Sequence, residues 1–383
     1  MNNQESREKA KETKKIVKKM FVLLKGSGHT VWELSQKLFI DENRVNYCLN
    51  KLTTSKKYLA GGFINKWRTH SGNFVYLYVP PIKKREPLPE KVFVCLPTSG
   101  YEGEKGMYQR VIIPDDVLGP NNKPAKCIEI VPFYDIHVGH RQCDMDLFRA
   151  DVEKVRRRPN RFAIFGGDSI ENALGDSAGG AAWADQSFPP DEQRVVFEEE
   201  IRGISHKTLV MIPGNHEHRT TKKALMCPLR EVAKSLEIPY FMGPVILDVT
   251  WRGFRWTFHI SHGRSGSNTP GGKLNAVGKP RNYVVADYFI MGHVHDKKSH
   301  RVSRLVPRRE FRDGKLVSFG IMQKVERKII CPSYLKYEGT YAQQAGYTPG
   351  SRESVIIQLN ADGNSTVATG SRTPEGDVSG III

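Results

Sequence analysis

The chain has 383 residues, a hydrophobic fraction of 39% and a net charge of +17, which suit one large domain with a smaller companion or two to three small domains. No run of about 18 apolar residues occurs, so we expect no membrane span, and the polar amino-terminal segment lacks the apolar core of a secretory signal. The six cysteines form no CxxC pair, which excludes zinc-finger spacing and favours reduced thiols in a cytoplasmic protein.

The positive charge is concentrated near the amino terminus. Residues 1–86 hold 18 lysines and arginines against 7 aspartates and glutamates, a net charge of +11, and the remaining 297 residues carry only +6. A basic module of this kind predicts a polyanionic partner, with nucleic acid first and an acidic membrane surface second. A basic helix that serves only solubility is the alternative. We favour nucleic acid and expect no membrane partner.

The first 80 residues carry helix signals followed by hairpin signals. Apolar periodicity predicts helices at 1–25, 31–38 and about 42–53. Thr30 with Glu33 three residues later forms a capping box, and Asp41 is a second helix cap. Strand-like runs around a Ser-Gly-Asn turn follow at 62–67 and 74–78. This order resembles a winged-helix domain, which we expect to span residues 1–80.

The resemblance to a winged helix implies that the helix over 42–53 enters a major groove. The side chains expected to meet bases are Asn43, Arg44, Asn46 and Asn50. Those expected to meet phosphates are Lys56, Lys57, Lys66 and Arg68. Many winged helices instead bind proteins or dimerise, so a protein partner and a homodimer remain alternatives.

Residues 81–126 begin with a proline-rich, charged junction, and we expect a linker followed by a capping segment. Over 127–369, apolar runs alternate with helix-length segments, which predicts an α/β layered fold. The strand-like runs are 128–133, 162–165, 208–212, 257–260, 284–290, 327–331 and 355–359. The helix-length segments are 144–156, 191–202 and 225–236. Residues 370–383 are rich in Gly, Ser and Thr and are expected to form a flexible tail.

Five polar motifs, most of them at the ends of these strands, together supply two Asp, one Asn and five His. In order they are Asp-Ile-His at 135–137, Gly-Asp-Ser-Ile at 167–170, Gly-Asn-His-Glu at 214–217, Ser-His-Gly at 261–263 and Gly-His-Val-His at 292–295. Side chains at the carboxyl ends of strands converge at one edge of an α/β sheet. Carboxylate, imidazole and amide oxygen suit manganese, iron or zinc better than calcium. Two metal ions can be held by such a set, with positions left open for water and substrate.

This series resembles the signature of the calcineurin-like metallophosphoesterase superfamily, which is DxH, GDxx, GNH(D/E), H and GHxH, over about residues 127–340. The resemblance implies a sandwich of two mixed β-sheets flanked by helices. It also implies two divalent metal ions and hydrolysis of phosphoesters by an activated water, without a covalent enzyme intermediate. Manganese is the expected metal, with iron, zinc or magnesium as alternatives.

The same resemblance implies a role for each motif residue. Metal one would be held by Asp135, His137 and His295, and Asp168 would bridge both metals. Metal two would be completed by Asn215, His262 and His293. His216 would be the catalytic histidine, close to the scissile phosphate.

Four neighbours of the motifs are expected near the substrate: Asn172, His218, Arg219 and Arg264. Arg219 is the best placed for a bidentate phosphate contact, and Asn172 would orient either substrate or His216. A surface or supporting role is the alternative for each. The local pattern also resembles metallophosphoesterases carried by phages and other mobile elements. A more distant likeness is to the exonuclease subunit of the bacterial SbcCD complex.

The fold class alone does not decide the substrate. A basic winged helix beside a phosphoesterase site favours DNA or RNA, because tethering raises the effective concentration of the substrate. We therefore predict a metal-dependent nuclease or nucleic-acid end-processing phosphodiesterase. The alternative is a phosphomonoesterase acting on proteins or small nucleotides, whose winged helix binds a partner. A DNA-binding regulator with a vestigial enzyme domain is a third interpretation.

Overall fold

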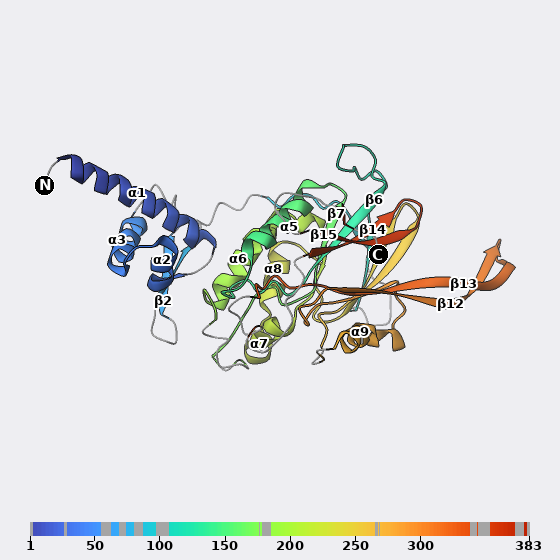
Figure 1. The fold of residues 1–383 in the computed structure, drawn as a ribbon. Coiled ribbons are helices and arrows are strands. Elements are labelled where there is room, and N and C mark those ends of the chain that lie inside the picture. Colours follow the sequence, from blue (N-terminus) through green and yellow to red (C-terminus); the bar gives the residue numbers. More distant parts are fainter. Residues whose placement is uncertain are drawn as a thin grey trace.

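The computed structural model contains an amino-terminal group of helices and a larger α/β part (Figure 1). The residues it describes are 3–26, 29–54, 63–68, 74–79, 87–96, 107–175, 177, 185–264, 267, 269–337, 343, 353–371 and 379–380. Among these residues, no helix combines the length and the apolar character needed to cross a membrane.

The amino-terminal part consists of three helices and a three-stranded sheet. Its elements are α1 (Asn3–Gly26), β1 (His29–Thr30), α2 (Val31–Leu38), α3 (Glu42–Thr53), β2 (Phe63–Arg68) and β3 (Phe74–Val79). The strands pair antiparallel in the order β1-β3-β2. The expected capping box is confirmed, because Thr30 Oγ1 accepts from the Glu33 amide and the Glu33 carboxylate accepts from the Thr30 amide. Asp41 caps α3 by accepting from the Arg44 amide.

An apolar core holds these three helices together. Its buried side chains are Val17, Met20, Leu24, Leu34, Val45, Cys48, Leu49, Leu52 and Tyr76. Within α3, Val45, Leu49 and Leu52 recur at helical spacing, so one face of the helix packs inward. Its polar side chains are left on the opposite, exposed face.

The α/β part contains two mixed sheets. The first has six strands in the order β16-β15-β14-β6-β7-β8. Its members are β6 (Cys127–Phe133), β7 (Arg161–Phe165), β8 (Thr208–Met211), β14 (Glu353–Asn360), β15 (Ser365–Ser371) and β16 (Ser379–Gly380). The neighbours β6, β7 and β8 are parallel, so their carboxyl ends meet at one edge of the sheet.

The second sheet has seven strands in the order β12-β13-β11-β10-β9-β5-β4. Its members are β4 (Val94–Leu96), β5 (Tyr108–Ile112), β9 (Val245–Trp251), β10 (Phe254–Ile260), β11 (Tyr288–Met291), β12 (Lys298–Arg312) and β13 (Lys315–Ile330). The pair β10 and β11 is parallel. The motif-bearing strands of this sheet therefore also end side by side.

The two sheets pack face to face between layers of helices. From β6, Ile128 and Ile130 pack into the core shared with Phe258 of β10, whereas Val131 and Phe133 belong to the outer core beneath the helices. Those covering helices are α5 (Met145–Arg157), α6 (Pro190–Arg202) and α8 (Pro228–Ser235). On the far side, α9 (Pro270–Gly278) packs on the seven-stranded sheet. The expected mixed α/β class is confirmed.

Several segments differ from the sequence prediction. Within residues 81–126, strand-like runs were expected at 92–96 and 111–113, and they overlap β4 and β5. These two strands join the seven-stranded sheet, because β5 pairs in parallel with β9. The expected tail, 370–383, begins inside β15 and includes β16, which pairs with β15. The elements that were not predicted include α7 (Asn215–Ala224), α9, β1, β9, β12, most of β13, β15 and β16.

Candidate metal centre

Strand ends from both sheets deliver the motif residues to one place. Asp135 and His137 follow β6, Asp168 follows β7, and β8 leads to Asn215 and His216 at the start of α7. From the other sheet, His262 follows β10, and His293 and His295 follow β11. Because the three parallel strands of one sheet and the two of the other end together, residues up to 158 positions apart come into hydrogen-bonding contact.

Five of these residues hold a left-handed backbone conformation that non-glycine residues rarely adopt. Their φ angles lie between 49° and 67°, at Asp135, His137, Asp168, His293 and His295. Such conformations cost about 1–3 kcal/mol each and persist where the surrounding structure imposes them, often at functional sites. Here the Asp135 amide donates to Gly167 O at 3.1 Å and the His137 amide to Asp168 O at 2.9 Å. These bonds hold the first two motif loops against each other.

Two motif glycines let the backbone approach the aspartates. A Cβ at Gly214 would lie 2.1 Å from Asp168 Oδ1, and one at Gly292 would lie 2.4 Å from Asp135 Oδ2. The His216 amide donates to Asp168 Oδ1 at 2.9 Å, and the His293 amide donates to Asp135 Oδ2 at 2.7 Å. Glycine is therefore required by close packing at both positions, and one oxygen of each carboxylate is anchored by the backbone.

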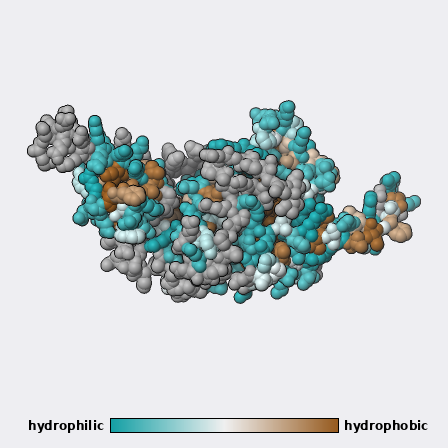
Figure 2. Space-filling view, in the orientation of Figure 1, coloured by the Kyte–Doolittle hydropathy of each residue, from teal (hydrophilic) through white to brown (hydrophobic). Residues whose placement is uncertain are grey.

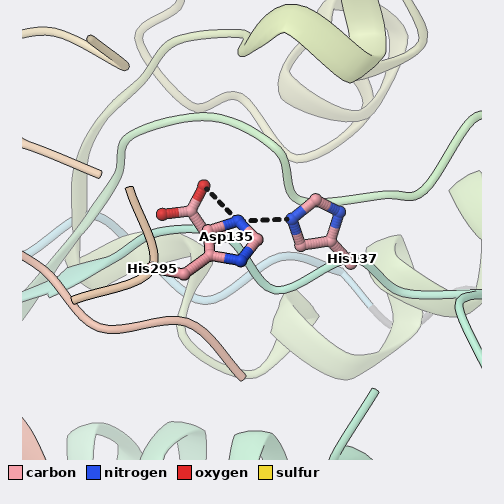
Figure 3. Close-up of side chains that lie close together, drawn as sticks. All are labelled: Asp135, His137 and His295. Carbon is pink, nitrogen blue, oxygen red and sulfur yellow. Dashed lines mark hydrogen bonds and ion pairs between the residues drawn. The ribbon is translucent and has the colours of Figure 1, made fainter. Parts of the chain in front are cut away.

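Asp135, His137 and His295 form the first cluster (Figure 3). His137 Nε2 lies 3.3 Å from His295 Nε2, which in turn lies 3.7 Å from Asp135 Oδ1. Asp135 is fully buried, and no hydrogen-bond donor from the described part of the chain reaches its Oδ1 atom. Burial raises the pKa of Asp135 to about 6, although His262 and His137 oppose the rise.

Asp168, Asn215, His262 and His293 form the second cluster. His262 Nε2 lies 3.2 Å from Asp168 Oδ2 and 2.9 Å from Asn215 Oδ1. His293 Nδ1 lies 2.9 Å from the same Asn215 oxygen. His262 Nδ1 lies 3.2 Å from Gly166 O and donates to it, which in a neutral ring leaves Nε2 as an acceptor. In that neutral form the lone pair of His262 would face two oxygens that are also acceptors. Burial lowers the pKa of His262, but the Asp168 carboxylate outweighs burial and raises it to about 9, which favours a proton on Nε2 when no cation is bound.

In the first cluster, two imidazole nitrogens lie close together. Glu171 Oε2 accepts a hydrogen bond from His137 Nδ1 at 3.0 Å, so that in a neutral ring the His137 Nε2 lone pair points toward His295. Buried acceptors in contact are unfavourable unless a cation or an extra proton lies between them. Neutral imidazoles and carboxylates suit a divalent cation, and a carboxylate behind a ligating histidine is a common support. These buried groups could hold metal ions.

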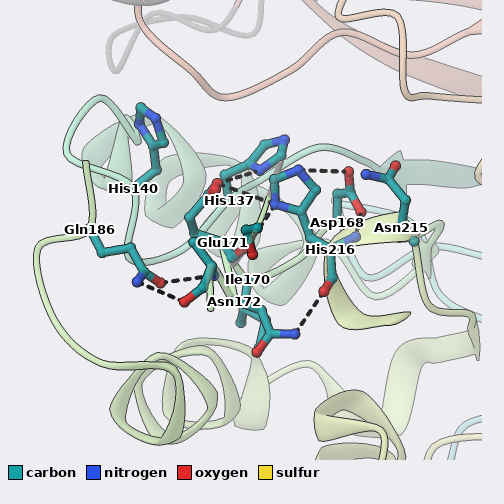
Figure 4. Close-up of polar contacts among 12 residues, drawn as sticks. His137, His140, Asp168, Ile170, Glu171, Asn172, Gln186, Asn215 and His216 are labelled. Carbon is teal, nitrogen blue, oxygen red and sulfur yellow. Dashed lines mark hydrogen bonds and ion pairs between the residues drawn. The ribbon is translucent and has the colours of Figure 1, made fainter. Parts of the chain in front are cut away.

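His216 lies between the two clusters (Figure 4). Its Nε2 is 3.7 Å from Asp168 Oδ2, its Nδ1 donates to Glu171 O at 2.7 Å, and its ring centroid is 4.5 Å from that of His137. Burial lowers the pKa of His216, but the carboxylates of Asp168 and Glu171 outweigh burial and raise it to about 9. The ring is thus held in a strongly negative pocket.

Glu217 supports the site, although the motif that contains it did not identify this role. Its carboxylate is fully buried and accepts from the backbone amides of Asp168 at 3.0 Å, Ile170 at 3.1 Å and Gly214 at 2.7 Å. It therefore joins the loop after β7 to the loop after β8. The sequence feature that could have indicated this supporting role is the glutamate at the last position of the Gly-Asn-His-Glu motif.

Glu171 and Gln193 are two further supports that were not placed in the site. Glu171 is 3% exposed and contacts the rings of both His137 and His216. Gln193, from α6, is fully buried and accepts from the Asn172 amide at 2.7 Å. The glutamate follows the second motif closely enough to be suspected. Nothing in the sequence marks the glutamine, because its role depends on where α6 packs.

Of the four residues expected near the substrate, two form hydrogen bonds inside the site, and the other two are partly or fully exposed to solvent. Asn172 is buried and donates to His216 O at 2.7 Å, so it orients the histidine rather than reaching the solvent. Arg219 donates to Glu171 O at 3.0 Å, and its Nη2 atom lies 3.1 Å from His216 Nε2, which places its guanidinium beside the expected catalytic group. His218 is half-buried on α7, and Arg264 is exposed on the loop after β10.

The expected nucleic-acid residues lie far from the motifs in sequence, and most of those described are open to solvent. Exposed side chains on α3 are Asn43, Asn46 and Asn50, and Lys66 is exposed on β2. Arg44 differs, because it is half-buried and donates to Thr13 Oγ1 of α1 at 2.8 Å. Lys56 and Lys57 lie outside the described residues, as does the side chain of Arg68.

Comparisons with known proteins identify no family for this chain. No protein-family model matches the chain, and no curated protein matches it. What the chain can do is therefore inferred from its own residues. The strongest of these observations concerns two groups of three residues, each with ligand atoms within 4.8 Å of one another: Asp135, His137 and His295, and Asp168, His262 and His293.

Proposed function

We propose that the chain is a metal-dependent phosphoesterase of the calcineurin-like type, which hydrolyses phosphodiester bonds in nucleic acid. The observation that carries the proposal is the convergence of the expected ligands, from five strand ends, into two clusters of carboxylate, amide and imidazole groups within hydrogen-bonding distance of one another. Two divalent cations, manganese first, suit this donor set. Two mixed sheets packed between helices agree with the family's fold.

In this proposal each residue of the candidate site has a role. Asp135, His137 and His295 would hold one cation, and Asn215, His262 and His293 the other, with Asp168 between them. Bound divalent cations supply Lewis acidity, which lowers the pKa of a water and offsets charge on phosphoryl oxygens. His216 can hold a proton at Nε2, beside Asp168 Oδ2, and pass it to the leaving oxygen. Arg219 Nη2, 3.1 Å from that nitrogen, can donate to a phosphate oxygen there.

The amino-terminal part supports a nucleic-acid substrate. The order of its helices and its β1-β3-β2 sheet agree with a winged-helix domain, in which α3 would be the recognition helix. It also lies beside the motif-bearing part, because Glu33 is 3.9 Å from Arg141, four residues after His137. A basic reader at this position would raise the concentration of a bound polynucleotide near the metal centre.

The test is hydrolysis by the full chain with added manganese. The substrates are bis-p-nitrophenyl phosphate, p-nitrophenyl phosphate, and end-labelled single- and double-stranded DNA and RNA. We expect cleavage of the diester and of at least one polynucleotide, abolished in Asp168→Ala and in His216→Ala. The matched control is Asp146→Ala, since Asp146 is an aspartate on α5 whose side chain is 95% exposed.

Three other outcomes would contradict the proposal in different ways. Turnover of the monoester alone would identify a phosphomonoesterase and leave the basic domain to bind another partner. Cleavage that survives Asp168→Ala would show that the clusters are not the active site. Metal binding without turnover of any substrate would favour a nucleic-acid-binding regulator.

A further inference from the structure

The hairpin of β12 and β13 projects from the α/β part as a two-stranded ribbon (Figure 1). β13 pairs with β11 only over Arg327–Ile330, so within the described chain residues 315–326 have β12 as their sole strand partner. At roughly 3.3 Å per residue, this part of the ribbon is about 40 Å long. A two-stranded ribbon with no packed face is marginal in water. Its length and isolation therefore point to a partner.

The ribbon holds the net positive charge of the α/β part. Residues 298–330 contain ten lysines and arginines and three acidic residues, a net charge of +7, whereas residues 87–383 as a whole carry +6. Near the base, Arg304 pairs with Glu326 at 2.8 Å and Lys324 with Asp287 at 2.9 Å. The cations toward the tip are all exposed, and they are Arg308, Arg309, Arg312 and Lys315.

One face of the ribbon is also apolar (Figure 2). Side chains alternate along each strand, so Leu305 and Pro307 share a face with Ile321 and Phe319 of the opposite strand. Leu305 is 76% exposed, Ile321 74% and Phe319 82%. Arg309 lies opposite Phe319 in the register and belongs to the same face. Exposed apolar side chains gathered in this way mark an interaction surface.

We propose that this ribbon binds in a groove of a double-helical nucleic acid. A major groove admits a two-stranded β-ribbon, the cations toward the tip can meet the phosphates, and apolar side chains can contact base edges and sugars. The ribbon begins at Lys298, three residues after the expected ligand His295, so a duplex held on it leads toward the metal centre. The inference rests on the proposed function only for the identity of the polyanion.

A second copy of the chain fits the ribbon less well. Two ribbons of charge +7 repel each other, and burial of their cations against one another would be costly. Addition of a further strand to β12, which is the edge strand of its sheet, is impeded by Pro307 and by the irregular register at Glu310 and Phe311. Charge complementarity therefore favours nucleic acid over self-association.

The experiment is fluorescence anisotropy of the full chain with labelled 30-base-pair DNA and RNA duplexes and the matching single strands. It is run in EDTA, so that no hydrolysis is needed, from 50 to 200 mM salt. The ribbon variant carries Arg308→Gln, Arg309→Gln, Arg312→Gln and Lys315→Gln. The control removes the same charge from exposed positions elsewhere in the α/β part, by Lys123→Gln, Lys126→Gln, Arg230→Gln and Lys234→Gln.

We expect the ribbon variant to bind duplex at least about tenfold more weakly than the control. Its salt slope should be smaller by about 0.9 for each phosphate that the substituted side chains no longer neutralise. A second variant, Phe319→Ser with Ile321→Ser, should weaken duplex binding at an unchanged slope. Hydrolysis of bis-p-nitrophenyl phosphate should remain as in the parent protein, which separates this inference from the proposed activity.

Three results would overturn the ribbon proposal. One is equal weakening by the ribbon and control variants, which would show a general charge effect. Another is a loss confined to single strands, which would exclude docking in a groove. The third is unchanged duplex binding together with a change of mass by light scattering, which would identify the ribbon as an interface with a second copy.

Discussion

The amino-terminal part and the candidate metal centre differ in where their polar residues lie. Among the described residues of the amino-terminal part, His29 is the one buried polar side chain, and the core is otherwise apolar. At the metal centre, Asp135, Asp168 and His262 are all buried against one another. Burying polar groups is costly unless they are satisfied, so their gathering points to a specific chemistry. Exposed polar residues carry no such cost, and α3 therefore shows a surface rather than a site.

The sharpest test of this comparison is one aspartate from each part. Asp168→Ala removes the carboxylate between the two clusters, and we expect hydrolysis to fall by at least about 10³-fold with a loss of bound metal measured by mass spectrometry. Asp41→Ala removes only the cap of α3 and should cost about 1 kcal/mol of folding stability, with diester hydrolysis intact. Similar losses of activity in both would break the distinction.

The next largest effect compares two glutamates that accept backbone amides. Glu217→Ala leaves three buried amides without their acceptor, and we expect a loss of about 3 kcal/mol or more in the free energy of unfolding. Glu33→Ala leaves one amide at a partly exposed helix start and should cost about 1 kcal/mol. Urea unfolding measures both values. A Glu217 variant as stable as the Glu33 variant would contradict the role assigned to burial.

Each part contains a buried histidine whose titration makes the folding stability depend on pH. Burial lowers the pKa of His29 to about 4, with Lys37 adding to the effect, and burial alone lowers that of His259 to about 4. Below pH 6.5 these histidines bind a proton in the unfolded chain but stay neutral in the folded chain. The free energy of unfolding therefore falls as the pH falls from 6.5 toward 4. Each histidine should remove about 2 kcal/mol between pH 6.5 and pH 5.

The measurement is urea unfolding at pH 7, 6.5 and 5 of the parent chain and of His29→Gln and His259→Gln. Each substitution should flatten the pH dependence, whatever it does to stability at pH 7. A pH dependence that survives both substitutions would assign the acid sensitivity to other groups.

The smallest expected effect concerns the exposed face of α3. Asn43→Ala, Asn46→Ala and Asn50→Ala together should weaken DNA binding by only a few fold and leave the salt slope unchanged, because the side chains are neutral. Lys66→Gln should instead lower the slope by about 0.9 if it meets a phosphate. Anisotropy over a salt series checks both. No change in any of these variants would contradict the role predicted for Asn43, Asn46, Asn50 and Lys66.

Local features of this protein follow directly from its sequence. The caps at Thr30 and Asp41 act within three residues, and the structure contains both. Apolar runs set β6, β7 and β8 close to their expected bounds, since burial on both faces of a strand needs a continuous apolar segment. The motif residues could be singled out for the same reason, because they break these runs at the strand ends.

Other features depended on contacts that no local signal contains. α7 begins on the polar motif at Asn215 and has no clear apolar stripe, so its helical form rests on packing and on Glu217. The charged β12 becomes a strand because β13 pairs with it along nearly its whole length.

The metal centre itself is the strongest case of this dependence on tertiary structure. The sequence singled out which residues could hold metal ions, but Asp135 and the His293 amide are 158 positions apart in the chain. Only the parallel pairing of β6, β7 and β8 in one sheet and of β10 and β11 in the other brings such groups together. Strand order and register depend on how the two sheets bury their shared core, which involves residues from the whole α/β part. No single stretch of sequence therefore determines them.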